Sequence, residues 1–251
     1  MSTPRPAAPA GRRHLPGARH VATRAERIVA DVREALFERR WRPGDFLGTE
    51  KELAARYGAS RIVARDALRT LEALGVVEIR RGAGGGARIS SGNPRLFAEA
   101  LAVQLELADI DVDEIFAAQH AIEGLAAELA AKRATADDVL SLKNLLEKAQ
   151  NAVDDVERFT QLSLAFHLAI ADASRNRVLH YQLVSLQHVS WPARNRTLTR
   201  AVALRVLEAH RELAARIAAH DPEGARHLMD EHVHMIHTRR ASERGHKHAF
   251  C

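Results

Sequence analysis

The chain has 251 residues, enough for two domains, and an aromatic content of only 4% with abundant Ala, Leu and Arg favours helices over sheets. Its single cysteine, Cys251, excludes an internal disulfide framework, and no signal peptide or membrane-length apolar run is evident, so we expect a cytoplasmic protein. The net charge of +5 is uneven. Residues 1–92 carry 18 Lys and Arg against 10 Asp and Glu, whereas residues 93–251 carry 19 against 22, so only the first part is expected to bind a polyanion.

The first regular element is expected after an irregular N-terminus. Residues 1–22 mix Pro, Gly, Ala and Arg without periodicity, which predicts a disordered basic tail. From residue 23 to about residue 40, apolar residues recur at the spacing of a helix. Pro43 and Gly44 then predict a turn, because Pro fixes φ and Gly tolerates a positive φ.

Two short helices joined by a tight turn follow. Thr49 and Glu52 have the spacing of a capping box, in which each side chain satisfies an orphan backbone donor at the start of a helix. This helix is expected to end near Gly58. Ser60 then caps a second helix, and Gly75 terminates it.

A pair of short strands completes this region. Residues 76–80 and 87–90 have the composition of strands and flank a glycine-rich tip at 82–86. Two short helices followed by such a strand pair form a winged helix-turn-helix, whose second helix enters the major groove of DNA. We therefore assign residues 23–91 to a DNA-binding domain.

The rest of the chain is expected to be helical. Helices are predicted at 95–108, 111–132, 136–151, 154–173, 176–190, 199–219 and 222–238. Their antiparallel packing would make a bundle over residues 95–238, followed by a flexible tail at 239–251. The predicted fold class is thus mostly α, with an N-terminal winged helix-turn-helix and a C-terminal antiparallel all-α helical bundle.

The second of the two short helices carries the candidate DNA-reading side chains. Arg61 and Arg65 are four residues apart and so project from one face, next to Ser60 at the start of the helix. Arginine can read guanine O6 and N7 with two parallel hydrogen bonds, and it also binds phosphate. This pattern favours double-stranded DNA as a partner, with a winged helix used only for protein contacts as the alternative.

These motifs resemble the winged helix of the GntR family of transcription regulators. The matching segments are Pro43-Gly44, Glu52-Leu53-Ala54, Ser60 to Leu68 and Leu71-Glu72-x-x-Gly75, with Ala64 and Asp66 as departures from the family pattern. The resemblance implies that six residues contact DNA, namely Lys51, Ser60, Arg61, Arg65, Arg81 and Gly82.

Three of the fourteen histidines lie on apolar stripes of three different predicted helices. These are His167, His210 and His232. Each is expected to face the bundle core, where an imidazole needs partners for its nitrogens. Taken singly, each could be a hydrogen-bonded core residue. Together, three neutral imidazoles suit Zn, Ni, Cu or Fe with an open coordination position.

The order of these histidines resembles the FCD sensor domain of FadR-type members of the GntR family. The matching motifs are Phe166-His167, His210 ahead of Asp221-Pro222, and Met229-x-x-His232. The resemblance implies that His167, His210 and His232 hold a divalent transition metal, most readily zinc. It also implies a small organic effector that binds beside the metal.

Two positions depart from the pattern of that domain. Ser163 stands where a ligating Asp is common, so water or the effector would have to complete the coordination of the metal. Gln119 stands where an Arg is common, four residues before Glu123, and its amide brings no charge to an effector carboxylate. We expect Gln119, Glu123 and Ser163 to contact the effector.

Together these features predict a DNA-binding transcriptional regulator rather than an enzyme. We expect a metabolite-responsive repressor that binds a pseudo-palindromic operator as a homodimer, with an organic carboxylate or related metabolite as effector. One alternative is the same regulator without metal, sensing a larger ligand such as an acyl thioester. Another is a three-histidine metalloenzyme, although no carboxylate lies at a motif spacing to the histidines to act as a general base.

Overall fold

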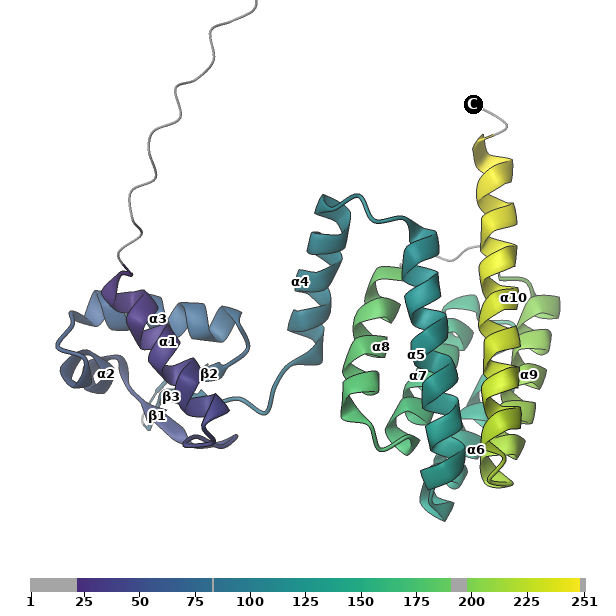
Figure 1. Cartoon of the computed structure of the whole chain (residues 1–251), viewed down its shortest axis with the longest axis horizontal. Helices are drawn as coiled ribbons and strands as arrows, with labels where there is room; N and C mark the ends of the chain where they lie inside the picture. The colour runs from purple at the N-terminus through teal and green to yellow at the C-terminus, as the bar shows by residue number, and fades with distance from the viewer. Residues whose placement is uncertain (1–21, 83, 191–197, 249–251) are drawn as a thin grey trace, which may run out of the picture. The chain divides into compact units, whose positions relative to one another are not determined.

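The computed structural model describes residues 22–82, 84–190 and 198–248, and the chain divides after Gly92 into two compact units (Figure 1). This boundary falls in the break predicted between the two domains. Residues 1–21 of the predicted basic tail lie outside the described residues. None of the described helices combines the length and apolar character that a membrane crossing requires.

The N-terminal unit contains three helices and a small antiparallel sheet. The elements are α1 (Arg24–Phe37), β1 (Phe46–Gly48), α2 (Glu50–Arg56), α3 (Arg61–Ala73), β2 (Val77–Arg80) and β3 (Gly86–Ile89). The sheet has the order β1-β3-β2, and Val77 of β2 lies opposite Ile89 of β3. This is the predicted winged helix-turn-helix, with one strand more than expected.

The additional strand, β1, has only three residues, too few for the alternation that marks a strand in a sequence. It pairs with β3 through Phe46 opposite Arg88 and Gly48 opposite Ala87, with an irregular register between them. Leu47, between these two positions, is 1% exposed and belongs to the core of the unit. Tertiary pairing with β3, rather than local propensity, therefore creates this strand.

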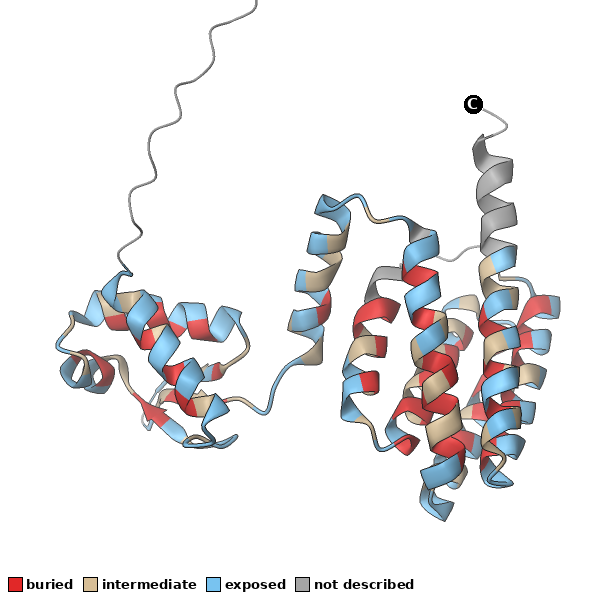
Figure 2. Cartoon of the chain, in the orientation of Figure 1, coloured by how far each residue is buried: buried red, intermediate tan, exposed pale blue. Residues whose placement is uncertain are grey.

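Helix caps and a shared core hold α1, α2 and α3 in place. Thr49 and Glu52 form the predicted capping box at the start of α2, and the Val63 N–H donates to Ser60 Oγ at 3.3 Å at the start of α3. Buried side chains of the three helices and the sheet form one core, which includes Ile28 and Leu71. Figure 2 marks the buried positions of this unit in red. Each such side chain contributes about 1.5–3 kcal/mol by burial.

The C-terminal unit is a bundle of seven helices within the described residues. They are α4 (Pro94–Leu107), α5 (Val112–Arg133), α6 (Ala136–Gln150), α7 (Val156–Ala173), α8 (Arg177–Ser190), α9 (Arg200–Ala218) and α10 (Pro222–His248). Helix α5 contacts α7, α8, α9 and α10, which makes it the central element of the bundle (Figure 1). All seven helices correspond to predicted ones.

The main difference in this unit concerns the end of the last helix. Helix α10 continues to His248, so residues 239–248 are helical where the sequence pattern predicts a flexible tail. That segment is rich in Arg, Lys, His and Glu and lacks the apolar repeat by which a helix is recognised. The other predicted bounds agree with the structure to within a few residues.

Candidate DNA-binding surface and candidate metal centre

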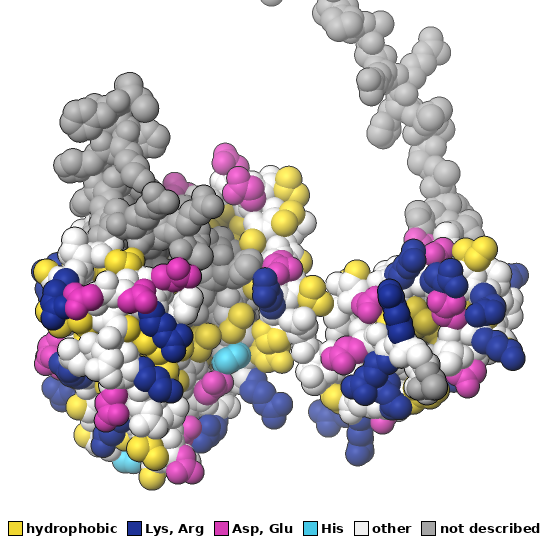
Figure 3. Space-filling model, turned by 180° about the vertical axis from the view of Figure 1, so that it is seen from behind, with side chains coloured by type: hydrophobic (Ala, Val, Ile, Leu, Met, Phe, Trp, Pro, Cys, Tyr) yellow, Lys and Arg dark blue, Asp and Glu magenta, His cyan; other side chains and the backbone are white. Residues whose placement is uncertain are grey.

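A groove of about 670 Å³ lies between α2, α3 and the β2–β3 wing of the N-terminal unit. Figure 3 shows dark blue Lys and Arg side chains spread over the face of this unit that is turned to the viewer. The groove is lined by six cationic side chains (Lys51, Arg61, Arg65, Arg69, Arg80 and Arg81) and two acidic ones (Glu50 and Glu72). This excess of positive charge on a concave surface suits a polyanion.

Helix α3 presents its polar face to this groove because its apolar face lies in the core. Ala64, Ala67 and Leu71 are buried, whereas Arg61 and Arg65 are exposed. Five of the six residues predicted to contact DNA line the groove, namely Lys51, Arg61, Arg65, Arg81 and Gly82. The sixth, Ser60, lies at the N-cap of α3.

The glycines at the tip of the wing allow its backbone to fold tightly. A Cβ on Gly85 would lie 2.5 Å from the carbonyl oxygen of Arg80, so no larger residue fits there without a shift of the backbone. Gly82 has a φ of +96°, a conformation that L side chains rarely adopt. At these glycines no side chain covers the backbone, so a sugar-phosphate chain can approach it closely.

Arg65 has an acidic partner that sequence reasoning missed. Its Nε donates to Glu50 Oε1 at 2.8 Å, and its Nη2 donates to Glu50 Oε2 at 2.9 Å. This hydrogen-bonded pair lowers the pKa of Glu50, with further contributions from the charges of Arg65, Arg61 and Arg69. The two residues are fifteen positions apart, so no local spacing rule could connect them.

In the bundle, His167 from α7, His210 from α9 and His232 from α10 meet in the core, and all three are buried. His210 Nε2 lies 3.2 Å from His167 Nε2 and 3.1 Å from His232 Nε2. Nitrogens bound tetrahedrally at about 2.0–2.1 Å from zinc lie roughly 3.3–3.4 Å apart. The spacing and chemistry of these donors therefore fit a divalent transition metal.

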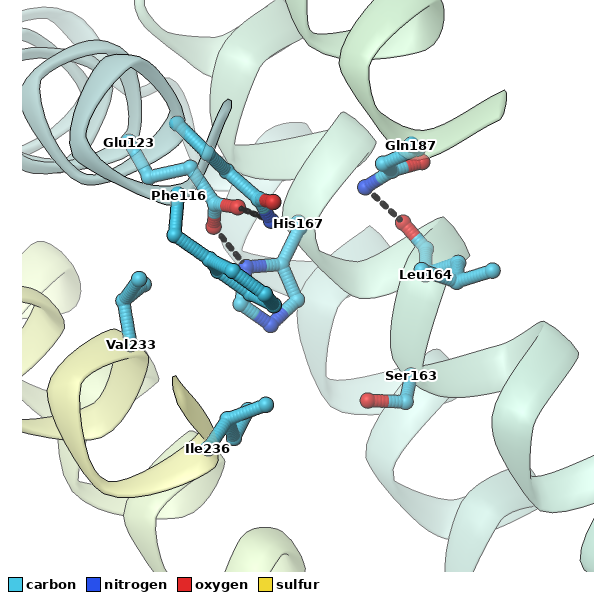
Figure 4. Close-up of a pocket in the computed structure, with 9 residues that line it drawn as sticks. Phe116, Glu123, Ser163, Leu164, His167, Gln187, Val233 and Ile236 are labelled. Atoms are coloured by element: carbon cyan, nitrogen blue, oxygen red, sulfur yellow. Dashed lines mark hydrogen bonds and ion pairs between the residues drawn. The ribbon is translucent and has the colours of Figure 1, made fainter. Parts of the chain in front are cut away.

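Glu123, from α5, contacts Nδ1 of His167 (Figure 4), whereas Nε2 of the same ring lies near His210. His167 Nδ1 donates to Glu123 Oε2, and Gln119 Nε2 donates to Glu123 Oε1 at 2.5 Å. With its proton on Nδ1, His167 has the Nε2 lone pair free for a metal. The spacing of residues along the chain did not predict that a carboxylate lies beside the histidines. Glu123 contacts His167 only because α5 packs on α7.

The other two histidines are held in their neutral form. The ring of Phe166 stacks on that of His210, with centroids 4.4 Å apart and planes inclined by 13°. Burial, together with the nearby His232 and His167, holds the pKa of His210 well below its usual value. Burial, and then the proximity of His167, lower the pKa of His232 to about 3. Neutral imidazole is the form that binds a metal.

His232 Nδ1 is buried and makes no hydrogen bond within the described residues. A buried polar atom without a partner costs stability, so packing alone does not explain a histidine at this position. A metal bound at Nε2 would offset this cost through its own bond to the imidazole, while Nδ1 itself would still lack a partner among the described residues.

A small pocket opens beside His167 (Figure 4). All three residues predicted to contact the effector line it, namely Gln119, Glu123 and Ser163, and so does Gln187. Its free volume of about 10 Å³ accommodates roughly one water molecule. Both carboxylate oxygens of Glu123 are bonded to protein groups, and Gln119 and Gln187 donate hydrogen bonds to Glu123 and to the Leu164 carbonyl oxygen.

The neutral histidines predict an acid-sensitive fold. The unfolded chain has an ordinary histidine pKa of about 6.5, above the pKa of about 3 for folded His232. Between these values the unfolded state binds more protons, so stability is complete above pH 6.5 and falls as the pH is lowered. For metal-free protein we expect the free energy of unfolding to fall by about 2 kcal/mol between pH 7 and pH 5 because of His232. His210 should change it in the same direction.

Urea titrations of chelator-treated protein at several pH values measure this loss. The matched control replaces His227, an exposed histidine on the same helix as His232, by Gln and should leave the pH profile unchanged. A free energy of unfolding that is constant from pH 7 to pH 5 would contradict neutral, buried histidines.

Comparison with known proteins adds independent observations. The model of "Bacterial regulatory proteins, gntR family" matches residues 24–86, and that of the "FCD domain" matches residues 114–235. The chain is 33% identical over 221 residues to a "Putative L-lactate dehydrogenase operon regulatory protein" of Escherichia coli K12, covering 84% of each chain. It is 28% identical over 203 residues to the "Uxu operon regulator" of Haemophilus influenzae, covering 77% of this chain and 73% of that protein.

Among solved structures, "Streptococcus agalactiae GntR" matches with a TM-score of 0.60 and 25% identity, covering 84% of this chain and 98% of that one. The similarity therefore extends across both units. The matched families and relatives are transcriptional regulators rather than enzymes.

Proposed function

The chain belongs to the GntR family of DNA-binding transcriptional regulators and carries an FCD domain, and on this premise we propose that it is a metabolite-responsive repressor with a three-histidine metal centre. The observation that carries the proposal is the convergence of three buried imidazoles in a chain that also has a basic winged-helix groove. The first would form the sensor, and the second would bind the operator.

His167, His210 and His232 would hold the metal, with zinc favoured over nickel, iron or copper because three nitrogen donors at tetrahedral spacing suit it well. Glu123 would orient His167 and increase its basicity, a task different from the effector contact that the sequence pattern suggests. The ion would supply positive charge and an open position for an effector oxygen.

The effector proposed here is a small organic carboxylate or a related metabolite. Among the described residues that line the pocket there is no Lys or Arg, so the positive charge for a carboxylate would come from the metal. Gln119 and Ser163 would contribute uncharged hydrogen bonds. The name of the E. coli relative, which refers to an L-lactate dehydrogenase operon, agrees with an organic acid. Because the pocket is nearly closed, effector binding would have to move the surrounding helices.

The repressor would act in the cytoplasm as a homodimer on a pseudo-palindromic operator, because one winged helix covers too little DNA for high specificity. The alternative without metal, in which a larger ligand such as an acyl thioester binds the bundle, gains no support from a pocket with room for about one water molecule.

Selection from a pool of random duplex DNA tests the proposed DNA binding. Wild-type protein should enrich a two-fold symmetric sequence with half-sites about one helical turn apart. Arg61→Ala should weaken binding to that sequence by about 1–3 kcal/mol, because Arg61 is an exposed cation of the groove. Fluorescence anisotropy at fixed salt measures the affinity.

Arg95→Ala is the matched control for the Arg61 variant. Arg95 is an exposed arginine on α4 and does not line the groove, so its removal should leave operator affinity within error of wild type. Enrichment of no sequence at all by the wild type would refute the proposed DNA binding. Equal affinities of the two variants would show that the groove is not the contact surface.

A further inference from the structure

The contact between Glu50 and Arg65 leaves a defined part of the guanidinium free. A guanidinium has five N–H groups arranged along two hydrogen-bonding edges, one made by Nε and Nη2 and the other by Nη1 and Nη2. Glu50 occupies the first edge with two hydrogen bonds of 2.8 and 2.9 Å. The second edge has no part in this contact, and it is itself a bidentate donor that matches guanine O6 and N7.

Both partners are fixed by the secondary structure that carries them. Glu50 is the first residue of α2, directly after the Thr49 cap, so its backbone position is set by the capping box. Arg65 lies one turn into α3, whose apolar face is anchored in the core by Ala64 and Leu68. The packing of α2 on α3 thus brings the Glu50 carboxylate to the exposed arginine.

A free arginine side chain must lose conformational freedom when it binds DNA, and that loss reduces both affinity and selectivity. An arginine already paired on one edge has lost much of this freedom before DNA arrives. The side chains of Glu50 and Arg65 are 31% and 49% exposed, so the pair lies at the surface of the groove, where DNA can reach it.

We propose that Glu50 is a positioning residue for base recognition, which holds the Nε–Nη2 edge of Arg65 so that the Nη1–Nη2 edge faces a guanine in the major groove. The inference rests on the proposed DNA binding and assigns to an acidic residue a role in specificity. Glu50 would oppose DNA binding through its charge and would nevertheless sharpen the choice of sequence.

The test separates these two effects with a charge-matched control. Glu72 also lines the groove, from the last turn of α3, so Glu72→Gln and Glu50→Gln each remove one negative charge from the same surface. Glu50→Asp keeps the charge but shortens the side chain, which breaks the two-point contact with Arg65. Each full-length variant is first checked for an unchanged helical circular dichroism spectrum and melting curve.

Specificity is then measured on the duplex that the wild type enriches, on versions substituted at each base pair, and on random duplex. Both Gln variants should bind random duplex more tightly, because phosphate binding is governed by net charge. Only the Glu50 variants should lose selectivity, by about tenfold at one G·C pair in each half-site. Arg65→Lys should reduce selectivity at the same G·C base pair. The double variant Glu50→Gln/Arg65→Lys should be no less selective there than Arg65→Lys alone.

Four results would overturn the inference. Glu50→Gln with the same base preferences as Glu72→Gln would show that Glu50 acts only as a charge. Glu50→Gln with tighter operator binding and unchanged selectivity would show that Glu50 competes with DNA for Arg65. Loss of selectivity by Glu50→Gln at a base pair that Arg65→Lys does not affect would show that Glu50 does not act through Arg65. Failure of the wild type to enrich any sequence would refute the DNA binding itself, and the inference with it.

Discussion

Replacing His210 by Ala should abolish the stabilisation of the folded chain by metal. His210 Nε2 lies between the Nε2 atoms of His167 and His232, at 3.2 and 3.1 Å, so its loss removes the central donor of the cluster. A metal that binds only the folded state stabilises it by about 4 kcal/mol at a thousand times its Kd. In a chain of this size that corresponds to a rise in Tm of roughly 10 °C.

Thermal melting of wild type and variant, each with added zinc and with chelator, measures this difference. Wild-type protein should melt at a higher temperature with zinc, and His210→Ala should melt at the same temperature in both conditions. His227→Ala, which removes an exposed histidine from α10, should keep the full zinc effect. A zinc effect of equal size in His210→Ala would place the metal elsewhere in the chain.

Glu123→Gln should weaken metal binding by about 10- to 100-fold without removing any donor atom of the cluster. The amide oxygen can still accept the hydrogen bond from His167 Nδ1, but it lacks the charge that makes the imidazole a stronger donor to the metal. Glu123 is also a buried carboxylate, 1% exposed, whose charge a bound dication would balance. The substitution removes this complementarity as well.

Competition with a metal-binding dye gives the affinities for this comparison. Ser163→Ala is the matched control, because Ser163 lines the same pocket but contributes no carboxylate, and its metal affinity should stay within a few-fold of wild type. Equal affinities of Glu123→Gln and wild type would mean that the carboxylate does not act on the metal centre through His167.

The sequence predicted those parts of the molecule that depend on local patterns. The capping box of Thr49 and Glu52, the cap at Ser60 and the apolar repeats determine the helices of both units. The three histidines were found because each lies on the apolar face of a different helix, so packing the helices together had to bring them into one core.

Apart from the helical residues 239–248, the features that the sequence did not predict depend on contacts between distant segments. Strand β1 exists because Phe46 and Gly48 pair with β3. The hydrogen bonds of Glu50 to Arg65 and of Glu123 to His167 each join two different helices. Both pairs couple an acidic side chain with a residue that the sequence pattern singles out as a candidate, so the sequence indicated the candidate side chains but not the contacts that orient them.

The metal content of the purified full-length protein tests the central claim most directly. The protein is loaded with zinc, freed of unbound metal by gel filtration and analysed for elements alongside its protein concentration. A metal centre formed by His167, His210 and His232 predicts about one equivalent per chain, lost on treatment with chelator. Less than about a tenth of an equivalent after loading would contradict the metal centre.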